Sequence, residues 1–122
     1  MRPYPELPGL DALYLEDSYV LGVREEATEL RFELEAVLTE AHPKWSTPKS
    51  GEQYAYLPVD LVFPHPRRVE WIERTMKPIS GPDGERDFGN IDSFVWRPGW
   101  FEMKGEWGHV RIESDPPIVV ER

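Results

Sequence analysis

The chain of 122 residues contains no cysteine. Disulfide bonds, thiolate catalysis and cysteine-based zinc or iron–sulfur sites are therefore excluded. Long apolar runs are missing as well, since none approaches the ~20 residues that a membrane-spanning helix needs. The first residues are rich in proline and lack the apolar segment of a signal peptide. These absences lead us to expect a cytoplasmic protein that does not associate with membranes.

Motifs for cofactors and catalysis are also absent. The chain has no Gly-x-Gly-x-x-Gly, Walker-type, Gly-x-Ser-x-Gly or His-Glu-x-x-His sequence. Its three histidines, His42, His65 and His109, lie in different predicted elements and share no spacing typical of metal ligands. Residues 83–87 lack the spacing of a calcium-binding loop and are expected to form a turn. The sequence therefore predicts no cofactor and no metal site.

Acidic side chains outnumber basic ones by 23 to 14, which gives a formal net charge of −9. A chain of this charge repels phosphate backbones, so we do not expect it to bind nucleic acid. The charge either keeps the protein soluble or forms an acidic face that receives a basic partner. The length fits one domain, residues 1–122, and 15 aromatic residues can supply its core.

The N-terminal third combines a proline-rich arm with a predicted hairpin. Residues 1–10 carry three prolines and are expected to lie extended against the body or to be mobile. Residues 19–38 are typical of a β-hairpin, because apolar residues occupy every second position from 30 to 38 and alternate with polar residues as far as Glu35. One face of the second strand carries Leu30, Phe32, Leu34, Ala36 and Leu38. The other face carries Glu29, Glu33 and Glu35.

The middle of the chain alternates loops and strands. Residues 39–53 contain turn-forming pairs and predict a loop, and residues 54–63 predict a strand. Pro58 cannot donate a hydrogen bond to a ladder, which favours an edge or bulged position for that strand. Residues 67–75 predict a further strand or a short helix, and residues 80–84 predict a turn.

The C-terminal third predicts a three-stranded meander over residues 90–97, 100–104 and 107–114. Two-residue turns at Pro98-Gly99 and Gly105-Glu106 would pair Trp96 with Phe101 and Glu102 with His109. In this register one face is almost wholly apolar, with Phe94, Trp96, Phe101, Met103, Gly108, Val110 and Ile112. A final short strand at 118–120 is expected at a sheet edge.

The opposite face of this meander is the candidate binding site, and it comprises Arg97, Trp100, Glu102, Trp107, His109 and Arg111. Trp100 would lie between two arginines, which permits cation–π stacking. Glu102 and His109 could act as a general acid–base pair, but no nucleophile or oxyanion hole accompanies them. The alternative is that Trp100 and Trp107 pack beneath another segment.

Three stretches carry a resemblance. They are Tyr-Leu-Glu-Asp-Ser-Tyr-Val-Leu at 14–21, Gly-Asn-Ile-Asp-Ser-Phe at 89–94 and Gly-Glu-Trp-Gly-His-Val-Arg-Ile-Glu-Ser-Asp at 105–115. Together they resemble a family of small bacterial proteins of unknown function, over about residues 12–120. The resemblance implies no catalytic residue. In size and acidity the chain is also similar to bacterial toxin-immunity proteins.

These patterns predict an all-β or β-dominated α+β fold, with about seven or eight strands in two packed antiparallel sheets or one curved sheet. The leading functional hypothesis is a non-enzymatic binding module for a protein partner, in an immunity-like or assembly role. Edge strands also favour a homodimer. The alternative is a small-molecule or sugar-binding protein, or an enzyme, with a tryptophan-lined pocket that includes Glu102, His109 and Arg111.

Overall fold

The computed structural model describes residues 1–82 and 84–122, and strands dominate it. Asp83, which belongs to the turn expected at 80–84, lies outside the described residues. Eight of the described strands have four or more residues, in agreement with the number expected from the sequence. No helix in the described chain is long and apolar enough to cross a membrane.

One layer of the fold is a four-stranded antiparallel sheet. Its strands are β2 (Leu13–Glu25), β3 (Glu29–Leu38), β4 (Tyr56–Pro64) and β11 (Ile118–Glu121), in the order β11-β4-β3-β2. The predicted hairpin is confirmed, although its first strand begins earlier than expected. The alternation in β3 buries the five predicted apolar side chains and turns the glutamates outward.

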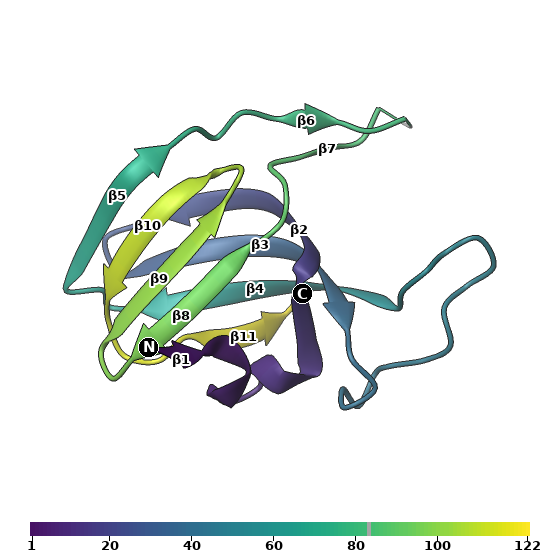
Figure 1. Ribbon diagram of the computed structural model, residues 1–122, viewed down its shortest axis with the longest axis horizontal. Coiled ribbons are helices and arrows are strands. Elements are labelled where there is room, and N and C mark those ends of the chain that lie inside the picture. The colour runs from purple at the N-terminus through teal and green to yellow at the C-terminus, as the bar shows by residue number, and fades with distance from the viewer. Residues whose placement is uncertain (83) are drawn as a thin grey trace.

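The second layer is a five-stranded antiparallel sheet that faces the first (Figure 1). Its strands are β1 (Arg2–Pro3), β8 (Ser93–Arg97), β9 (Trp100–Gly105), β10 (Gly108–Glu113) and β5 (Arg68–Arg74), in the order β1-β8-β9-β10-β5. The chain crosses between the layers from β4 to β5 and from β10 to β11. The fold is therefore β-dominated and sandwich-like, as the sequence predicts.

Two smaller features flank the sandwich. The N-terminal arm forms the 3-10 helices η1 (Tyr4–Glu6) and η2 (Leu10–Ala12), and it packs down through Tyr4, Leu7 and Leu10, which are buried. Strands β6 (Ile79–Ser80) and β7 (Arg86–Asp87) form a separate small hairpin that projects beside β2 (Figure 1). This hairpin contacts the body chiefly through β7 and β2.

The core between the two sheets is rich in aromatic side chains. Phe63 of β4 packs edge-on against Phe101 of β9, and Phe32 of β3 packs edge-on against Trp107, with centroids 5.5 and 5.2 Å apart. Edge-to-face pairs of this kind each add about 0.5–1.5 kcal/mol beyond the area they bury. The apolar faces of the two sheets therefore pack against each other, as the alternation of apolar and polar residues along the strands predicts.

The register between β9 and β10 differs from the prediction by two residues. Gly105 pairs with Gly108, so the turn consists of Glu106-Trp107 and not of Gly105-Glu106. The reason is Trp107, whose large side chain is wholly buried at the reversal. Because side chains in a strand alternate with a period of two, a slip of two residues leaves the two faces unchanged. The predicted register of β8 and β9 is confirmed, with Trp96 opposite Phe101.

The position of β4 also corrects the prediction, because this strand lies inside the sheet between β3 and β11. The β3–β4 register runs without a shift past Pro58, which pairs with Glu35. The Pro58 carbonyl accepts from the Arg122 N–H, so the proline nitrogen also faces the β11 side. Paired residues of β11 end at Glu121 opposite Val59, so the missing donor of Pro58 falls just beyond the end of the β4–β11 ladder.

Candidate functional site

The predicted surface on the five-stranded sheet centres on Glu102. His109 Nε2 lies 2.5 Å from Glu102 Oε2, and Arg111 Nε donates to the same oxygen at 3.1 Å. Burial by itself would raise the pKa of Glu102, but its bonds to His109 and Arg111 outweigh burial and hold that pKa below its ordinary value. The carboxylate is therefore charged, and its Oε2 already interacts with both His109 and Arg111.

Arginines and glutamates alternate across the rest of this surface. Arg111 Nη1 lies 3.9 Å from Glu70 Oε1 on the adjacent strand β5, and Glu70 accepts a hydrogen bond from Arg68 at 3.2 Å. Glu102 and Glu70 thus each have a basic partner. Exposed pairs of this kind add little stability, about 0–1 kcal/mol each, but they leave the surface nearly neutral.

The two tryptophans of the predicted surface lie in different environments. Trp100 is half-buried and lies opposite Glu113, not Arg111, and the Arg97 guanidinium stacks 5.0 Å from its ring centre. Trp107 is wholly buried, and its Nε1 donates to the Asn90 carbonyl at 2.9 Å. Five of the six predicted residues therefore share the outer face, and the placement of Trp107 there is wrong.

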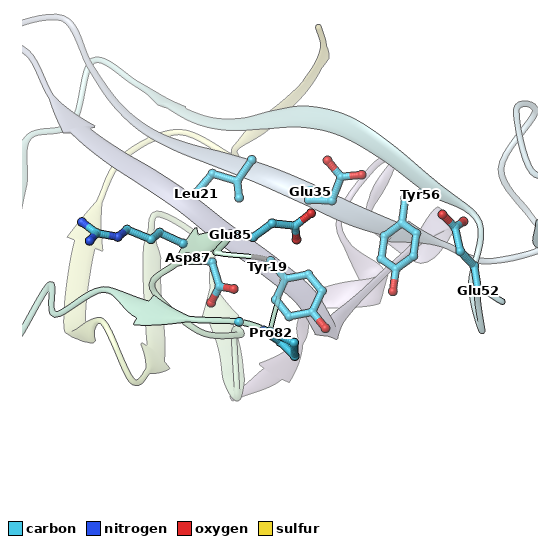
Figure 2. A pocket seen from close by; sticks show the side chains of 10 residues that line it. Tyr19, Leu21, Glu35, Glu52, Tyr56, Pro82, Glu85 and Asp87 are labelled. Atoms are coloured by element: carbon cyan, nitrogen blue, oxygen red, sulfur yellow. The ribbon is translucent and has the colours of Figure 1, made fainter.

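A cavity of about 730 Å³ opens elsewhere, on the outer side of the four-stranded sheet. We call it the tyrosine cleft. One wall is the sheet and the other is the β6–β7 hairpin (Figure 2). The cleft is lined by Tyr19, Leu21, Glu35, Glu52, Tyr56, Gly81, Pro82, Glu85, Arg86 and Asp87.

Strand geometry brings the sheet-side residues of the cleft together. Tyr19 of β2 pairs directly with Glu35 of β3, next to an irregularity in the register after Tyr14. Ser18 stabilises this irregularity, because its buried hydroxyl donates to the Tyr14 carbonyl at 2.8 Å and accepts from the Val37 N–H at 2.9 Å. The local break in alternation thus turns Tyr19 outward while Ser18 satisfies the displaced backbone groups.

Charges in the tyrosine cleft are not balanced. Four carboxylates line it, Glu35, Glu52, Glu85 and Asp87, against the single cation Arg86. Burial raises the pKa of Glu35, and although Arg122 opposes the shift, Glu52 and Glu85 reinforce it. Within residues 1–82 and 84–122, no basic side chain lies within ion-pair distance of Glu35. Like charges therefore converge on this space from both walls.

A row of tyrosines extends the cleft along the sheet. Tyr54 stacks edge-on against both Tyr14 and Tyr56, with centroids 6.2 and 6.3 Å apart. Its hydroxyl donates to Asp17 Oδ2 at 2.5 Å, and this bond is the main reason that the pKa of Tyr54 rises to about 12. A smaller cavity of about 210 Å³ adjoins here and shares Glu35, Glu52 and Tyr56 with the cleft, and it is also lined by Lys44 and Lys49.

The sequence predicted one residue of the tyrosine cleft but not the cleft itself. The alternation in residues 29–38 already placed Glu35 on an outward acidic face. It could not show that residues 79–87 fold back beside β2 and add Glu85 and Asp87. Among the described residues, no group of three or more histidines and carboxylates is arranged to hold a metal ion.

Comparison with known proteins identifies no relative of this chain. No family model, no curated protein and no solved structure matches the chain. The resemblance of the three motifs to a family of small bacterial proteins stays a prediction.

Proposed function

We propose that this protein is a non-enzymatic binding module and that another protein docks on its tyrosine cleft. The observation that carries the proposal is the cleft itself, a hollow of about 730 Å³ bordered by exposed aromatic and apolar side chains. Tyr14, Tyr19 and Leu21 are each about 40% exposed along one strand. Tyrosine is enriched at protein interfaces, because it offers a large rigid contact area with a polar tip.

The surface around Glu102 supports a binding role less well. Its central acids, Glu102 and Glu70, are paired with basic side chains, and both cavities described above lie on the other sheet. A sugar or small-molecule pocket built on Trp100 and Trp107 also loses support, because Trp107 lies in the core. We therefore favour a protein partner that docks on the four-stranded sheet.

Affinity capture with matched variants tests this proposal. The bait is the full chain, offered to a lysate of the cells that naturally produce it, and bound proteins are quantified by mass spectrometry. The cleft variant carries Tyr19→Ala and Tyr56→Ala. The control carries Arg97→Ala and Arg111→Ala, which change the other sheet. We expect a protein that the wild type and the control retain and that the cleft variant loses by roughly tenfold or more, as for interface hot spots.

Two outcomes would contradict the proposal. One is a partner that binds the cleft variant as well as the wild type. The other is the absence of any specifically enriched protein under conditions in which all three baits are folded, as checked by circular dichroism.

A further inference from the structure

The tyrosine cleft combines two recognition features, aromatic rings and several carboxylates. Its sheet wall presents the rings of Tyr19 and Tyr56, and carboxylates approach from both walls. Resting on the proposed function, we propose that the docked segment is a basic, extended peptide of the partner, with an arginine or lysine side chain held between the two tyrosines.

The sheet wall offers a cation two tyrosine rings and a carboxylate. Tyr19 is adjacent to Glu35 across the β2–β3 ladder, and Tyr56 is near enough to Tyr19 that, after the larger effect of burial, Tyr19 also raises the pKa of Tyr56. A guanidinium or ammonium over a tyrosine ring gains about 0.5–1 kcal/mol at an exposed site and more when water is excluded. The same chain already stacks arginine on an aromatic ring three times, at Trp71, Trp96 and Trp100.

The opposite wall adds the carboxylates of Glu85 and Asp87, which form no ion pair within the described residues although Arg86 stands between them in the sequence. Glu85 lies in the β6–β7 segment and still raises the pKa of Glu35 across the cleft, after the larger effect of burial. Two carboxylates that repel each other across a hollow are a poor arrangement for the empty protein. A cation between them would convert the repulsion into attraction on both sides.

The same charges argue against other occupants. Phosphate-bearing ligands and acidic segments would add like charge to four carboxylates and one arginine. A neutral apolar segment would leave Glu35 desolvated without a partner, which is costly. An extended segment also suits the open form of the cleft, which is bordered by a sheet on one side and a hairpin on the other.

A titration followed by nuclear magnetic resonance tests the inference. The isotope-labelled full chain is titrated with acetyl-Gly-Arg-Gly-Arg-Gly-Arg-Gly-amide, and separately with the same peptide carrying glutamate in place of arginine. We expect saturable shifts at Tyr19, Leu21, Glu35 and Tyr56 with the arginine peptide and none with the glutamate peptide. The affinity should fall as salt rises, because the contacts are ionic.

Matched variants separate a site from general attraction to an acidic protein. The cleft variant carries Glu35→Gln, Glu52→Gln and Glu85→Gln, and the control carries Glu26→Gln, Glu40→Gln and Glu113→Gln, which remove the same charge from other exposed places. We expect roughly a tenfold or greater loss of affinity in the cleft variant and less than twofold in the control. Equal losses, or shifts that spread over the surface without saturation, would overturn the inference.

Failure of this inference can be told apart from failure of the proposed function. If the arginine peptide does not bind while the captured partner still depends on Tyr19 and Tyr56, the cleft binds a protein but not a basic segment. If the captured partner also binds the Tyr19→Ala, Tyr56→Ala variant as well as it binds the wild type, the proposed docking role of the cleft is contradicted as well.

Discussion

Glu35 is a residue whose position costs stability and, in the proposed function, serves recognition. It projects from β3 into the tyrosine cleft, partly buried, beside Tyr19 and facing other carboxylates. A carboxyl group whose pKa is raised in the folded protein penalises folding once it ionises. Residues of this kind often mark binding sites, because selection for function tolerates the local loss of stability.

Replacement of Glu35 by Gln should therefore stabilise the protein at neutral pH. Protonation of Glu35 favours the folded state, so the penalty is absent below the unfolded pKa of about 4.3. It grows as pH rises through the raised pKa of the folded state. We expect the Tm of Glu35→Gln to exceed that of the wild type by roughly 2 °C at pH 7 and to match it near pH 3.5. A lower Tm at pH 7 would contradict this account, and Glu113→Gln serves as the exposed control.

The buried position of Trp107 could not be predicted from the residues around it. The sequence offered two places for this side chain, the outer face or the interior, and the assumed turn put it outside. The deciding facts are long-range, because Trp107 donates to the Asn90 carbonyl and packs against Phe32 on the opposite sheet. Neither contact leaves a signal in the local pattern of residues 105–109.

At the scale of elements, the β9–β10 turn shows how a large side chain sets a register. Gly105 and Gly108 close the reversal so that Trp107 can point into the core. A Cβ on Gly105 would overlap the Asn90 carbonyl and the Trp107 indole nitrogen, so only glycine fits there. The predicted turn one residue earlier kept both faces correct, because its register error was an even number of residues.

Gly105→Ala should destabilise the protein by about 2 kcal/mol or more, because the added methyl group has no room beside the buried indole. Gly22→Ala is the matched control, since its Cβ would meet only the flexible end of Glu33 at 3.0 Å. We expect that control to stay within about 0.5 kcal/mol of the wild type. Urea unfolding measures both, and equal midpoints for the two variants would show that the turn tolerates a side chain.

At the scale of the whole molecule, the two sheets present different outer faces. At the centre of the five-stranded sheet, Arg111 pairs with Glu102 and with Glu70. The four-stranded sheet balances Asp60 with Arg31 and Arg122, but the carboxylates of the tyrosine cleft form no ion pair among the described residues. This difference is why we assign docking to one layer of the sandwich and not to the other.

The sequence was sufficient to predict the layers but not the cleft. Alternation of apolar residues with a period of two predicts antiparallel strands and their buried faces, and these predictions were confirmed for β3, β8 and β9. The cleft depends on where the β6–β7 hairpin lies beside β2. That placement arises from a few contacts between segments far apart along the chain, such as the bond from the Phe88 N–H to the Val20 carbonyl, 68 residues away.

Site-specific photocross-linking tests the docking surface most directly. A benzoylphenylalanine is introduced at Leu21, in the tyrosine cleft, or at Ile72, on an edge strand of the other sheet; both side chains are exposed and apolar. In the cells that naturally produce the protein, we predict one distinct cross-linked partner from position 21 and none from position 72. A partner trapped only from position 72, or only a second copy of this chain from position 21, would contradict the account.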